Sequence, residues 1–288
     1  MPDGREEISV QVVTRIADIP AAVWDACAGT NNPFVSHAFL NALESSGSVS
    51  SETGWLPQHL FAADESGRVA ACMPTYLKNH SYGEYIFDWS WAEAYERAGG
   101  NYYPKLQSAV PFTPAMGPRL LLRPDVDDKY FDVLTAGMIQ LARQHNVSSL
   151  HVTFPTEDQW QRLGETGFLK RTSKQFHWEN RGYDSFDQFL EALNSRKRKT
   201  IKKERRRVTE QGITLHRLTG DDVKESHWDI FYGYYVNTID RKWGRPYLTR
   251  EFFSTLGDTM ADLAVLVIAE HDGQPVAGAL NLVGGDTI

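Results

Sequence analysis

The sequence predicts an α/β fold of the α+β type, in which two similar units each build a mixed central sheet. Residues 60–78 (LFAADESGRVAACMPTYLK) have the strand, tight turn, strand pattern that is typical of a β-hairpin. Residues 267–283 (VIAEHDGQPVAGALNLV) repeat it about 206 residues further on, with Gly273 matching Gly67. A chain of 288 residues is also long enough for two domains. We therefore expect a duplicated unit.

The first unit is expected to alternate strands and helices around its hairpin. Residues 8–14 read as a strand, and Asp18 and Ser36 are suited to cap helices over 20–28 and 37–45. Apolar residues recur near helical spacing in 125–144, which predicts an amphipathic helix. The remaining expected elements are a strand over 149–153, a helix opened by a capping box of Thr156 and Gln159, and a closing strand over 169–179.

The second unit begins at Ser185, which forms a second capping-box pattern with Gln188. Asn194 and Ser195 are suited to end that helix and cap the next, for which Gly212 is a plausible stop. Further elements are a strand over 214–218, a helix over 250–260 capped by Thr249, and the repeated hairpin. Between them lies an aromatic stripe with the spacing of an amphipathic helix, which we interpret as core: Trp228, Phe231, Tyr232, Tyr235 and Ile239.

The expected domain boundaries are 1–180 and 181–288. In the first unit roughly 100 residues follow the hairpin, whereas the chain ends five residues after the second hairpin. A unit cut at that point has an open sheet edge. The second domain is therefore expected to be incomplete, with roughly 100 residues missing.

Positive charge is concentrated in residues 195–207, SRKRKTIKKERRR. Nine of these thirteen residues are Lys or Arg, in a chain with 30 basic and 37 acidic residues. Such a concentration in an acidic protein favours contact with an anion, although a solvated helix face is the alternative. Ile201 and Val208 lie two turns apart on one face, which favours a docked helix over a free tail.

Aromatic residues are concentrated in 82–112, which holds nine of the 34 aromatic side chains. The segment contains prolines and glycines and has little periodicity. Such irregular aromatic inserts often line a cleft. A loop packed over its own aromatic rings explains the same composition, and the sequence leaves both interpretations open.

Several function classes lack their motifs in this sequence. It contains no G-x-S-x-G, H-E-x-x-H, C-x-x-C, P-loop or dinucleotide-binding glycine pattern. The nine histidines have no metal-ligand spacing, and Cys27 and Cys72 read as buried thiols. No apolar run approaches the roughly 18 residues of a membrane span, and the N-terminus lacks a secretory signal. We expect no metal, no membrane insertion and a cytoplasmic location.

Long words of the sequence resemble one bacterial group. They are PFVSHAFLNALE, YIFDWSWAEAY, YYPKLQSAVPFTPAMGPRLLL, SFDQFLEALNSRKRKTIKKERRR and TIDRKWGRPYLTREFF. The group is that of the Fem-like predicted N-acyltransferases, described as peptidoglycan biosynthesis/recognition proteins, and the resemblance covers residues 32–283. It implies two tandem N-acetyltransferase (GNAT) folds, and GETGF at 164–168 is similar to the closing turn of that superfamily.

The resemblance implies acyl transfer to an amine, on a small molecule or a cell-wall precursor. The implied donor is acyl-CoA or aminoacyl-tRNA, with no tightly bound cofactor. One departure is the GNAT phosphate-binding signature, R/Q-x-x-G-x-G/A, which is missing from both copies. In GNAT proteins that loop binds the donor pyrophosphate at a helix N-terminus, so its absence weakens an acetyl-CoA interpretation.

Site roles follow from combining these expectations. The donor phosphates are expected on the basic helix in the inter-domain cleft, at Arg196, Arg198, Lys202, Arg205 and Arg206. Backbone N–H groups of 276–281 would polarise the donor carbonyl. Asp88 and Tyr103 are the candidate acid/base residues, although an Asp in such a loop is more often a satisfied partner. The expected substrate-binding residues are Tyr85, Trp89, Trp91, Tyr102, Lys105, Arg241, Trp243 and Tyr247.

Two other functions fit the same features. The protein could be a module that binds tRNA through the basic helix and the aromatic loop, without chemistry. It could also be a non-catalytic recognition protein for cell-wall precursors.

Overall fold

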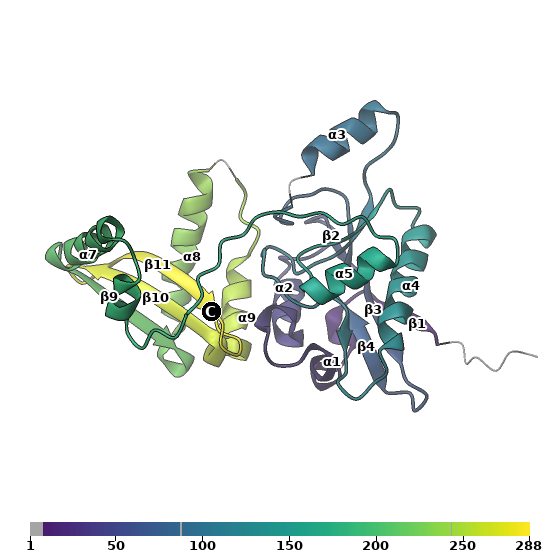
Figure 1. Cartoon of the computed structure of the whole chain (residues 1–288), viewed down its shortest axis with the longest axis horizontal. Coiled ribbons are helices and arrows are strands. Elements are labelled where there is room, and N and C mark those ends of the chain that lie inside the picture. The colour runs from purple at the N-terminus through teal and green to yellow at the C-terminus, as the bar shows by residue number, and fades with distance from the viewer. Residues whose placement is uncertain (1–7, 87, 243) are drawn as a thin grey trace, which may run out of the picture.

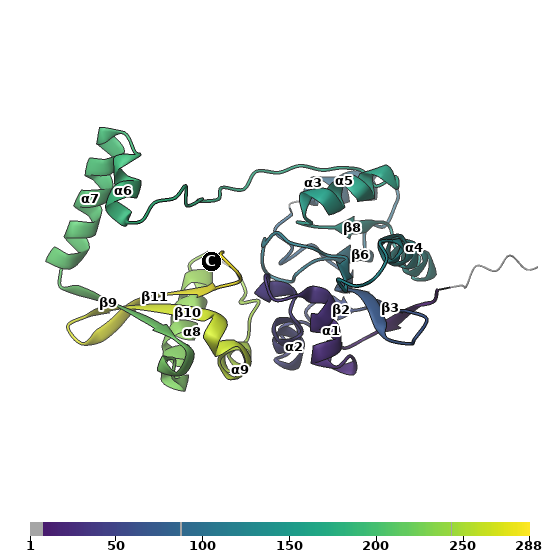
Figure 2. The ribbon, with the colours of Figure 1, turned by 60° about the horizontal axis from the view of Figure 1, so that its bottom comes forward.

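The computed structural model describes residues 8–86, 88–242 and 244–288. Figure 1 shows two parts side by side, an N-terminal part that ends with helix α5 and a C-terminal part that begins with helix α6. A long extended segment runs from one to the other (Figure 2).

The N-terminal part contains two four-stranded sheets, with orders β1-β3-β4-β7 and β2-β5-β6-β8. Only Gln58 separates β2 from β3, and only Pro74 separates β4 from β5, so one bent hairpin contributes to both sheets. The elements are β1 (Val10–Val13), α1 (Ala21–Ala28), α2 (His37–Ser45), β2 (Trp55–Pro57), β3 (His59–Ala63), β4 (Val69–Met73), β5 (Thr75–Lys78), α3 (Trp89–Arg97), β6 (Lys105–Ser108), β7 (Leu121–Leu122), α4 (Lys129–Gln144), β8 (Leu150–Val152) and α5 (Glu157–Glu165).

The C-terminal part contains one three-stranded sheet, of order β11-β10-β9. Helices α8 and α9 pack on one another, and α8 covers β11. Its elements are α6 (Phe186–Glu191), α7 (Ser195–Glu210), β9 (Ile213–Thr219), α8 (Glu225–Asp240), α9 (Arg250–Met260), β10 (Ala264–His271) and β11 (Gln274–Leu282). Short 3-10 turns lie at Ile16–Asp18, Pro33–Val35, Gly220–Asp222 and Ala261–Leu263.

The order strand, helix, helix, hairpin occurs in both parts. Strand β1 pairs antiparallel with β3 as β9 does with β10, and each hairpin continues into β4 or β11. Both hairpins have a bulge just before the turn, at Ala62/Ala63 and at Ala269/Glu270. The repeated pattern in the sequence therefore corresponds to a repeated local topology.

Two hydrophobic cores hold these elements. One lies under α4 and contains Leu60, Ala71, Leu134 and Met138. The other is shared by α1 and α2 of the first part and α8, α9 and β10 of the second. In it the expected aromatic stripe packs around Phe253, whose ring contacts those of Trp228, Phe231, Tyr232 and Tyr235. Because both parts bury side chains in this core, they form one packed unit.

Most of the expected helix starts are confirmed. The side chains of Ser36, Asn194 and Thr249 each accept a hydrogen bond from a backbone N–H in the first turn of α2, α7 and α9. The cap at Asp18 is wrong, because its carboxylate binds Arg15 and α1 begins after Pro20.

The capping box at Thr156 is also wrong. The Thr156 side chain makes no capping hydrogen bond. The Gln159 side chain instead accepts from the backbone N–H groups of Arg119 and Leu120 and donates to the Leu120 carbonyl. Gln159 therefore joins α5 to the segment before β7, a tertiary role that overrides the local pattern.

The strand expected over 169–179 does not form. The segment lies between the two parts (Figure 2), and Leu169 and Phe176 are 97% and 98% exposed. A strand needs a surface on which to bury its apolar face, and these two side chains have none along this path. Every helix within the described residues is too short or too polar to cross a membrane.

Candidate functional site

A small cavity of about 120 Å³ lies where the two parts meet. Its described lining residues are Ser81, Tyr82, Gly83, Tyr85, Ile86, Trp89 and Tyr247. Tyr85, Trp89 and Tyr247 were among the residues expected to bind substrate. The fold thus brings together one residue of the C-terminal part and the loop that precedes α3.

Tyr247 is held in place by contacts from both parts. The Tyr235 hydroxyl on α8 accepts hydrogen bonds from the backbone N–H groups of Tyr247 and Leu248, each at 3.0 Å. The Tyr247 ring stacks on Phe112 with a centroid separation of 5.1 Å and an interplanar angle of 8°. This wall of the cavity therefore depends on the packing between the two parts.

Gly83 lies in the cavity wall at a position that requires glycine. Its φ is +78°, and a Cβ atom there would lie 2.5 Å from Cδ1 of Phe112. The Phe112 N–H also donates a 3.0 Å hydrogen bond to the Gly83 carbonyl. The loop and the Phe112 ring therefore fit together only with a bare backbone at this point.

A buried cluster of charges is joined to this cavity through Ser81. The Lys105 ammonium donates to Ser81 Oγ at 2.7 Å, Glu84 Oε2 at 2.7 Å and Asp88 Oδ2 at 2.6 Å. The Tyr102 hydroxyl donates to the same Asp88 oxygen at 2.8 Å. Lys105 and Asp88 are fully buried. Lys105 therefore uses all three N–H groups to hold the two carboxylates and the serine.

A second buried ammonium, that of Lys78 at the end of β5, is much less well satisfied. Its Nζ lies 3.6 Å from the centre of the Trp55 ring and 3.5 Å from the Tyr82 carbonyl oxygen. The nearest carboxylate oxygen, Glu84 Oε1, is 4.0 Å away. Among the described residues, Glu84 Oε1 and Asp88 Oδ1 have no hydrogen-bond partner. The cluster thus keeps two carboxylate oxygens that accept no hydrogen bond among the described residues.

Burial shifts the ionisation of these groups in different directions. Desolvation lowers the pKa of Lys78 to about 7, and it raises the pKa of Glu84 although Lys105 opposes the shift. Desolvation acts on Asp88 in the same way, but the hydrogen bond and the charge of Lys105 outweigh it and lower the Asp88 pKa. Burial also raises the pKa of Tyr103. Glu84 is therefore the more basic of the two carboxylates.

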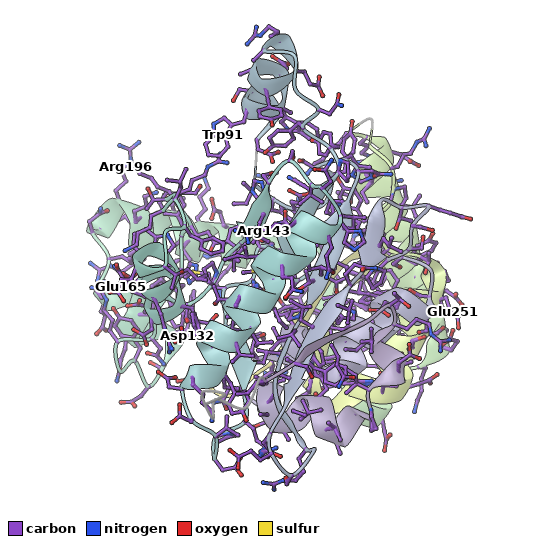
Figure 3. The ribbon with its side chains drawn as sticks, turned by 90° about the vertical axis from the view of Figure 1, so that its right-hand side faces the viewer. Trp91, Asp132, Arg143, Glu165, Arg196 and Glu251 are labelled. Carbon is purple, nitrogen blue, oxygen red and sulfur yellow. The ribbon has the colours of Figure 1, made fainter. Side chains whose placement is uncertain are left out.

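The structure separates the expected site residues into two groups. Asp88, Tyr102 and Lys105 meet in the buried cluster, and the Tyr103 hydroxyl lies 2.8 Å from Ser81 Oγ. Trp91 lies on the outer surface of the projecting helix α3 (Figure 3), with the Arg171 guanidinium 4.5 Å from its ring centre.

Two other expected substrate-binding residues lie elsewhere. Arg241 is exposed at the C-cap of α8, away from the cavity lining. Trp243 lies outside the described residues.

Sequence reasoning missed Lys78, Ser81 and Glu84. Lys78 ends a strand whose alternation gives no sign that its ammonium is buried, and Ser81 lies in an irregular loop. A signal was available in the words YGEYIFD and YYPKLQ, where two carboxylates four residues apart share an aromatic segment with a lysine. Buried ionisable groups in such a segment are typical of functional sites.

The basic helix α7 is well formed but does not line the cavity. Helices α6 and α7 stand away from the sheet, on the side of the C-terminal part far from the N-terminal part (Figures 1 and 2). No residue of α7 is buried. Lys202 pairs with Asp187 at 3.4 Å, and the Arg205 guanidinium lies 4.1 Å from the centre of the Phe186 ring. Figure 3 shows Arg196 at the outer surface.

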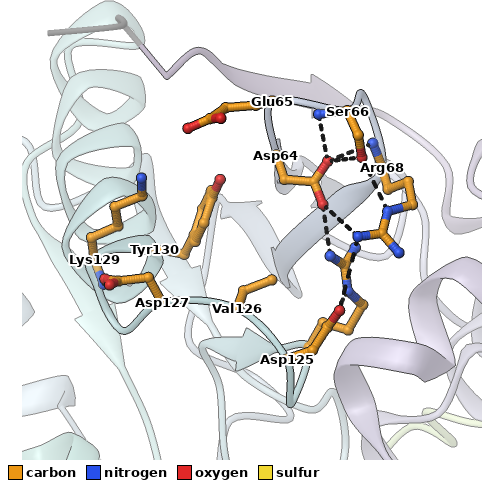
Figure 4. A pocket seen from close by; sticks show the side chains of 10 residues that line it. Asp64, Glu65, Ser66, Arg68, Asp125, Val126, Asp127, Lys129 and Tyr130 are labelled. Carbon is orange, nitrogen blue, oxygen red and sulfur yellow. Dashed lines mark hydrogen bonds and ion pairs between the residues drawn. The ribbon is translucent and has the colours of Figure 1, made fainter.

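A second hollow, of about 330 Å³, lies at the tip of the β3–β4 hairpin (Figure 4). Arg123 Nη2 pairs with Asp64 at 2.7 Å, and Arg123 also contacts Asp125 and the Val69 carbonyl. Arg123, Asp64 and Asp125 therefore neutralise one another in this hollow, and none of the expected site residues is among its described lining residues. The described residues also contain no cluster of three His, Cys, Asp or Glu side chains that could hold a metal ion.

The fold and the cavity define a mixed α/β protein with two packed parts. Its sequence shows the family to which it belongs. The profile of the FemAB-like family, described as peptidoglycan biosynthesis/recognition, matches residues 15–288. The chain therefore belongs to the FemAB-like family. No curated protein matches the sequence.

Solved acetyltransferase structures show a weaker similarity. A ribosomal-protein-alanine N-acetyltransferase from Brucella melitensis is 10% identical, with a TM-score of 0.37 over 61% of this chain and 100% of its own. The aminoglycoside 6'-N-acetyltransferase AAC(6')-Ih from Acinetobacter baumannii is 11% identical, with a TM-score of 0.36 over the same shares. These values are too low to carry the activities of those enzymes over to this chain.

Proposed function

We propose that this protein is an acyltransferase that moves an acyl or aminoacyl group from a phosphate-bearing donor to an amine. The donor is acyl-CoA or aminoacyl-tRNA, and the acceptor is a cell-wall precursor or another small molecule. Membership of the FemAB-like family over residues 15–288 supports this class of function. We also propose that residues 1–180 and 181–288 are two GNAT-like domains, on the basis of the strand, helix, helix, hairpin order found in both.

The observation that carries the proposal is the buried carboxylate of Glu84 behind the cavity. An attacking amine must lose a proton, and a carboxylate is a better base when its pKa is raised. Glu84 is 3% exposed, its pKa is raised by desolvation, and its Oε1 is free of hydrogen bonds among the described residues. We therefore assign the base to Glu84 in place of Asp88.

The neighbouring groups are suited to positioning and to proton donation. Lys105 fixes both carboxylates, and Asp88 is held by Lys105 and Tyr102. Tyr103 is protonated at neutral pH, as tyrosine ordinarily is, so its hydroxyl can donate to a leaving group. Ser81 joins Tyr103 to the cluster, with an Oγ–OH separation of 2.8 Å. In this scheme Asp88 positions and Tyr103 donates.

The donor phosphates are proposed to bind the exposed face of α7. The candidates remain Arg196, Arg198, Lys202, Arg205 and Arg206, because guanidinium groups suit bidentate phosphate contacts. Lys202 and Arg205 already contact Asp187 and Phe186, which orients them. Since α7 does not line the cavity, a donor bound there has to extend along the C-terminal part to reach the acceptor.

A transfer assay tests the proposal. The full chain is incubated with labelled acyl-CoA or with charged tRNA, in each case with a panel of amines, and the labelled amide is measured. We expect transfer from one donor class to at least one amine. Absence of transfer from every donor, by protein with a native circular dichroism spectrum, would contradict the proposal.

One observation favours a non-catalytic binding protein for a cell-wall precursor or tRNA. Each carboxylate of the cluster already accepts a short hydrogen bond from Lys105, as expected of a purely structural ion network. Under this alternative, tRNA or a precursor binds with measurable affinity and no donor is consumed. The same incubations distinguish the two functions when donor consumption is followed beside binding.

A further inference from the structure

We propose that the cavity between the two parts is an aromatic cage for an alkylammonium group. The inference rests on the proposed function in one respect, since the bound group would be the amine of the acceptor. The binding itself requires no acyl donor. It is carried by the composition of the cavity wall, by the charges behind that wall, and by the size of the cavity.

Most of the wall is aromatic. Of the described lining residues, Tyr82, Tyr85, Trp89 and Tyr247 are aromatic, and they come from both parts of the chain. The rings of Tyr82 and Trp89 lie 5.1 Å apart at 58°, so they form an angled pair. The face of an aromatic ring attracts a cation through its quadrupole, most strongly for Trp and when water is excluded. Several aromatic rings around one small space are typical of sites that recognise substituted ammonium ions.

The charges behind the wall also favour a cation. Glu84 and Asp88 lie on the loop that supplies the wall, and each has one carboxylate oxygen that accepts no hydrogen bond among the described residues, although Glu84 Oε1 lies 4.0 Å from Lys78 Nζ. All three N–H groups of Lys105 donate hydrogen bonds within this cluster. With its pKa near 7, Lys78 is only partly protonated at neutral pH. Neither carboxylate lines the cavity, but their negative charge is only partly balanced by the two lysines and therefore favours an ammonium over an anion there.

The volume limits the ligand to one small group. Drug-sized ligands and cofactors occupy pockets of roughly 300–1,000 Å³. At about 120 Å³ the cavity has room for the end of an aminoalkyl chain and is too small to enclose a nucleotide or a whole coenzyme. Ser81 also lines the cavity, and its hydroxyl oxygen already accepts a hydrogen bond from Lys105. The ligand class that fits is therefore an alkylammonium with its charge at the end of an aliphatic chain.

Binding of small probes to the full chain tests the inference. The probes are n-butylammonium, tetramethylammonium, neutral 1-butanol and the butyrate anion, followed by tryptophan fluorescence and by isothermal titration calorimetry. We expect both ammonium ions to bind at least about tenfold more tightly than 1-butanol, with no binding of butyrate. Equal affinity for n-butylammonium and 1-butanol, or preferential binding of butyrate, would overturn the inference.

Two matched variants locate the binding. Trp89→Leu removes a residue of the cavity wall that is 40% exposed. Trp178→Leu is the control, because Trp178 is 63% exposed on the segment between the two parts and is not among the described lining residues. We expect Trp89→Leu to weaken n-butylammonium binding at least about fivefold and Trp178→Leu to leave it unchanged. Equal effects of the two would also overturn the inference. Since no donor is present, ammonium binding without transfer activity contradicts only the proposed function, and transfer without ammonium binding contradicts only the cage.

Discussion

The buried charge cluster and the basic helix α7 use charge in opposite ways. The cluster contains two lysines and two carboxylates, Lys78, Lys105, Glu84 and Asp88, none more than 3% exposed. Helix α7 carries nine Lys and Arg residues over 195–207, and none of its residues is buried. The sequence predicts all of the charges of α7 but only Asp88 and Lys105 of the cluster.

This difference shows that the number of charged residues in a segment does not determine how strongly those charges affect one another. The charges of α7 lie in water, where they attract an anion over a distance and are screened by salt. The four charges of the cluster are removed from water, so their energies depend on one another and on the hydrogen bonds of Lys105. A functional site is therefore expected at the cluster, and an electrostatic surface at α7.

The largest predicted effect is on stability when Lys105 is removed. Lys105→Met leaves two buried carboxylates without their shared ammonium, which should reduce the free energy of unfolding by about 3–5 kcal/mol. The matched change Lys202→Met breaks an exposed pair on α7 and should alter stability by less than about 0.5 kcal/mol. Urea unfolding measures both, and similar losses would remove the distinction between the two regions.

A smaller loss is expected at the loop that carries the cavity wall. Gly83→Ala combines a positive φ of 78° with a collision against Phe112, and should cost about 2–4 kcal/mol. Gly67 has a φ of 80° and nothing within 4 Å of an added Cβ, so Gly67→Ala should cost only about 1–2 kcal/mol. The two melting curves separate backbone strain from the collision. Equal shifts in melting temperature would show that the Phe112 ring moves aside at no measurable cost.

The titration of Lys78 should appear in the pH dependence of stability. Its pKa falls from the ordinary 10.5 to about 7 in the folded protein, so between these values the unfolded chain binds more protons. The stability that this group contributes therefore rises as the pH increases from 7 to 10.5, by at most about 1.4 kcal/mol per pH unit. Lys78→Met should flatten that part of the curve, and an unchanged slope would argue against a desolvated ammonium.

The smallest effect on stability is expected from a double change on α7. Arg198→Ala with Lys202→Ala should leave the urea midpoint nearly unchanged, because neither side chain is buried. If α7 is the proposed phosphate site, the same variant should bind tRNA more weakly and with a shallower salt dependence, because fewer counterions are released. Fluorescence anisotropy at 50 mM and 200 mM salt measures this. Loss of stability without loss of binding would reverse the roles assigned to the two regions.

Local features of the fold were predictable and long-range features were not. Ser36, Asn194 and Thr249 cap their helices because a cap depends on residues within one turn. The expected strand over 169–179 failed because a strand depends on a distant partner. Helix α3 was not expected, since its Trp and Tyr residues lie in a segment without clear periodicity.

The candidate site was predictable to a similar extent. The aromatic insert indicated a cleft, and Tyr85, Trp89 and Tyr247 do line one cavity. Asp88 and Lys105 meet because β6 and the loop before α3 pack together, which no spacing in the sequence encodes. Burial decides which carboxylate has the raised pKa, and burial of a single charged side chain is a property of the tertiary structure.

The central claim is that the carboxylate of Glu84 accepts the proton in acyl transfer. The most direct measurement compares the transfer rates of Glu84→Gln and Glu93→Gln, a matched change at an exposed position of α3, after circular dichroism shows that both are folded at the assay temperature. We predict that Glu84→Gln lowers the rate at least about 100-fold and that Glu93→Gln leaves it unchanged. A folded Glu84→Gln protein that retains the parent rate would contradict the claim.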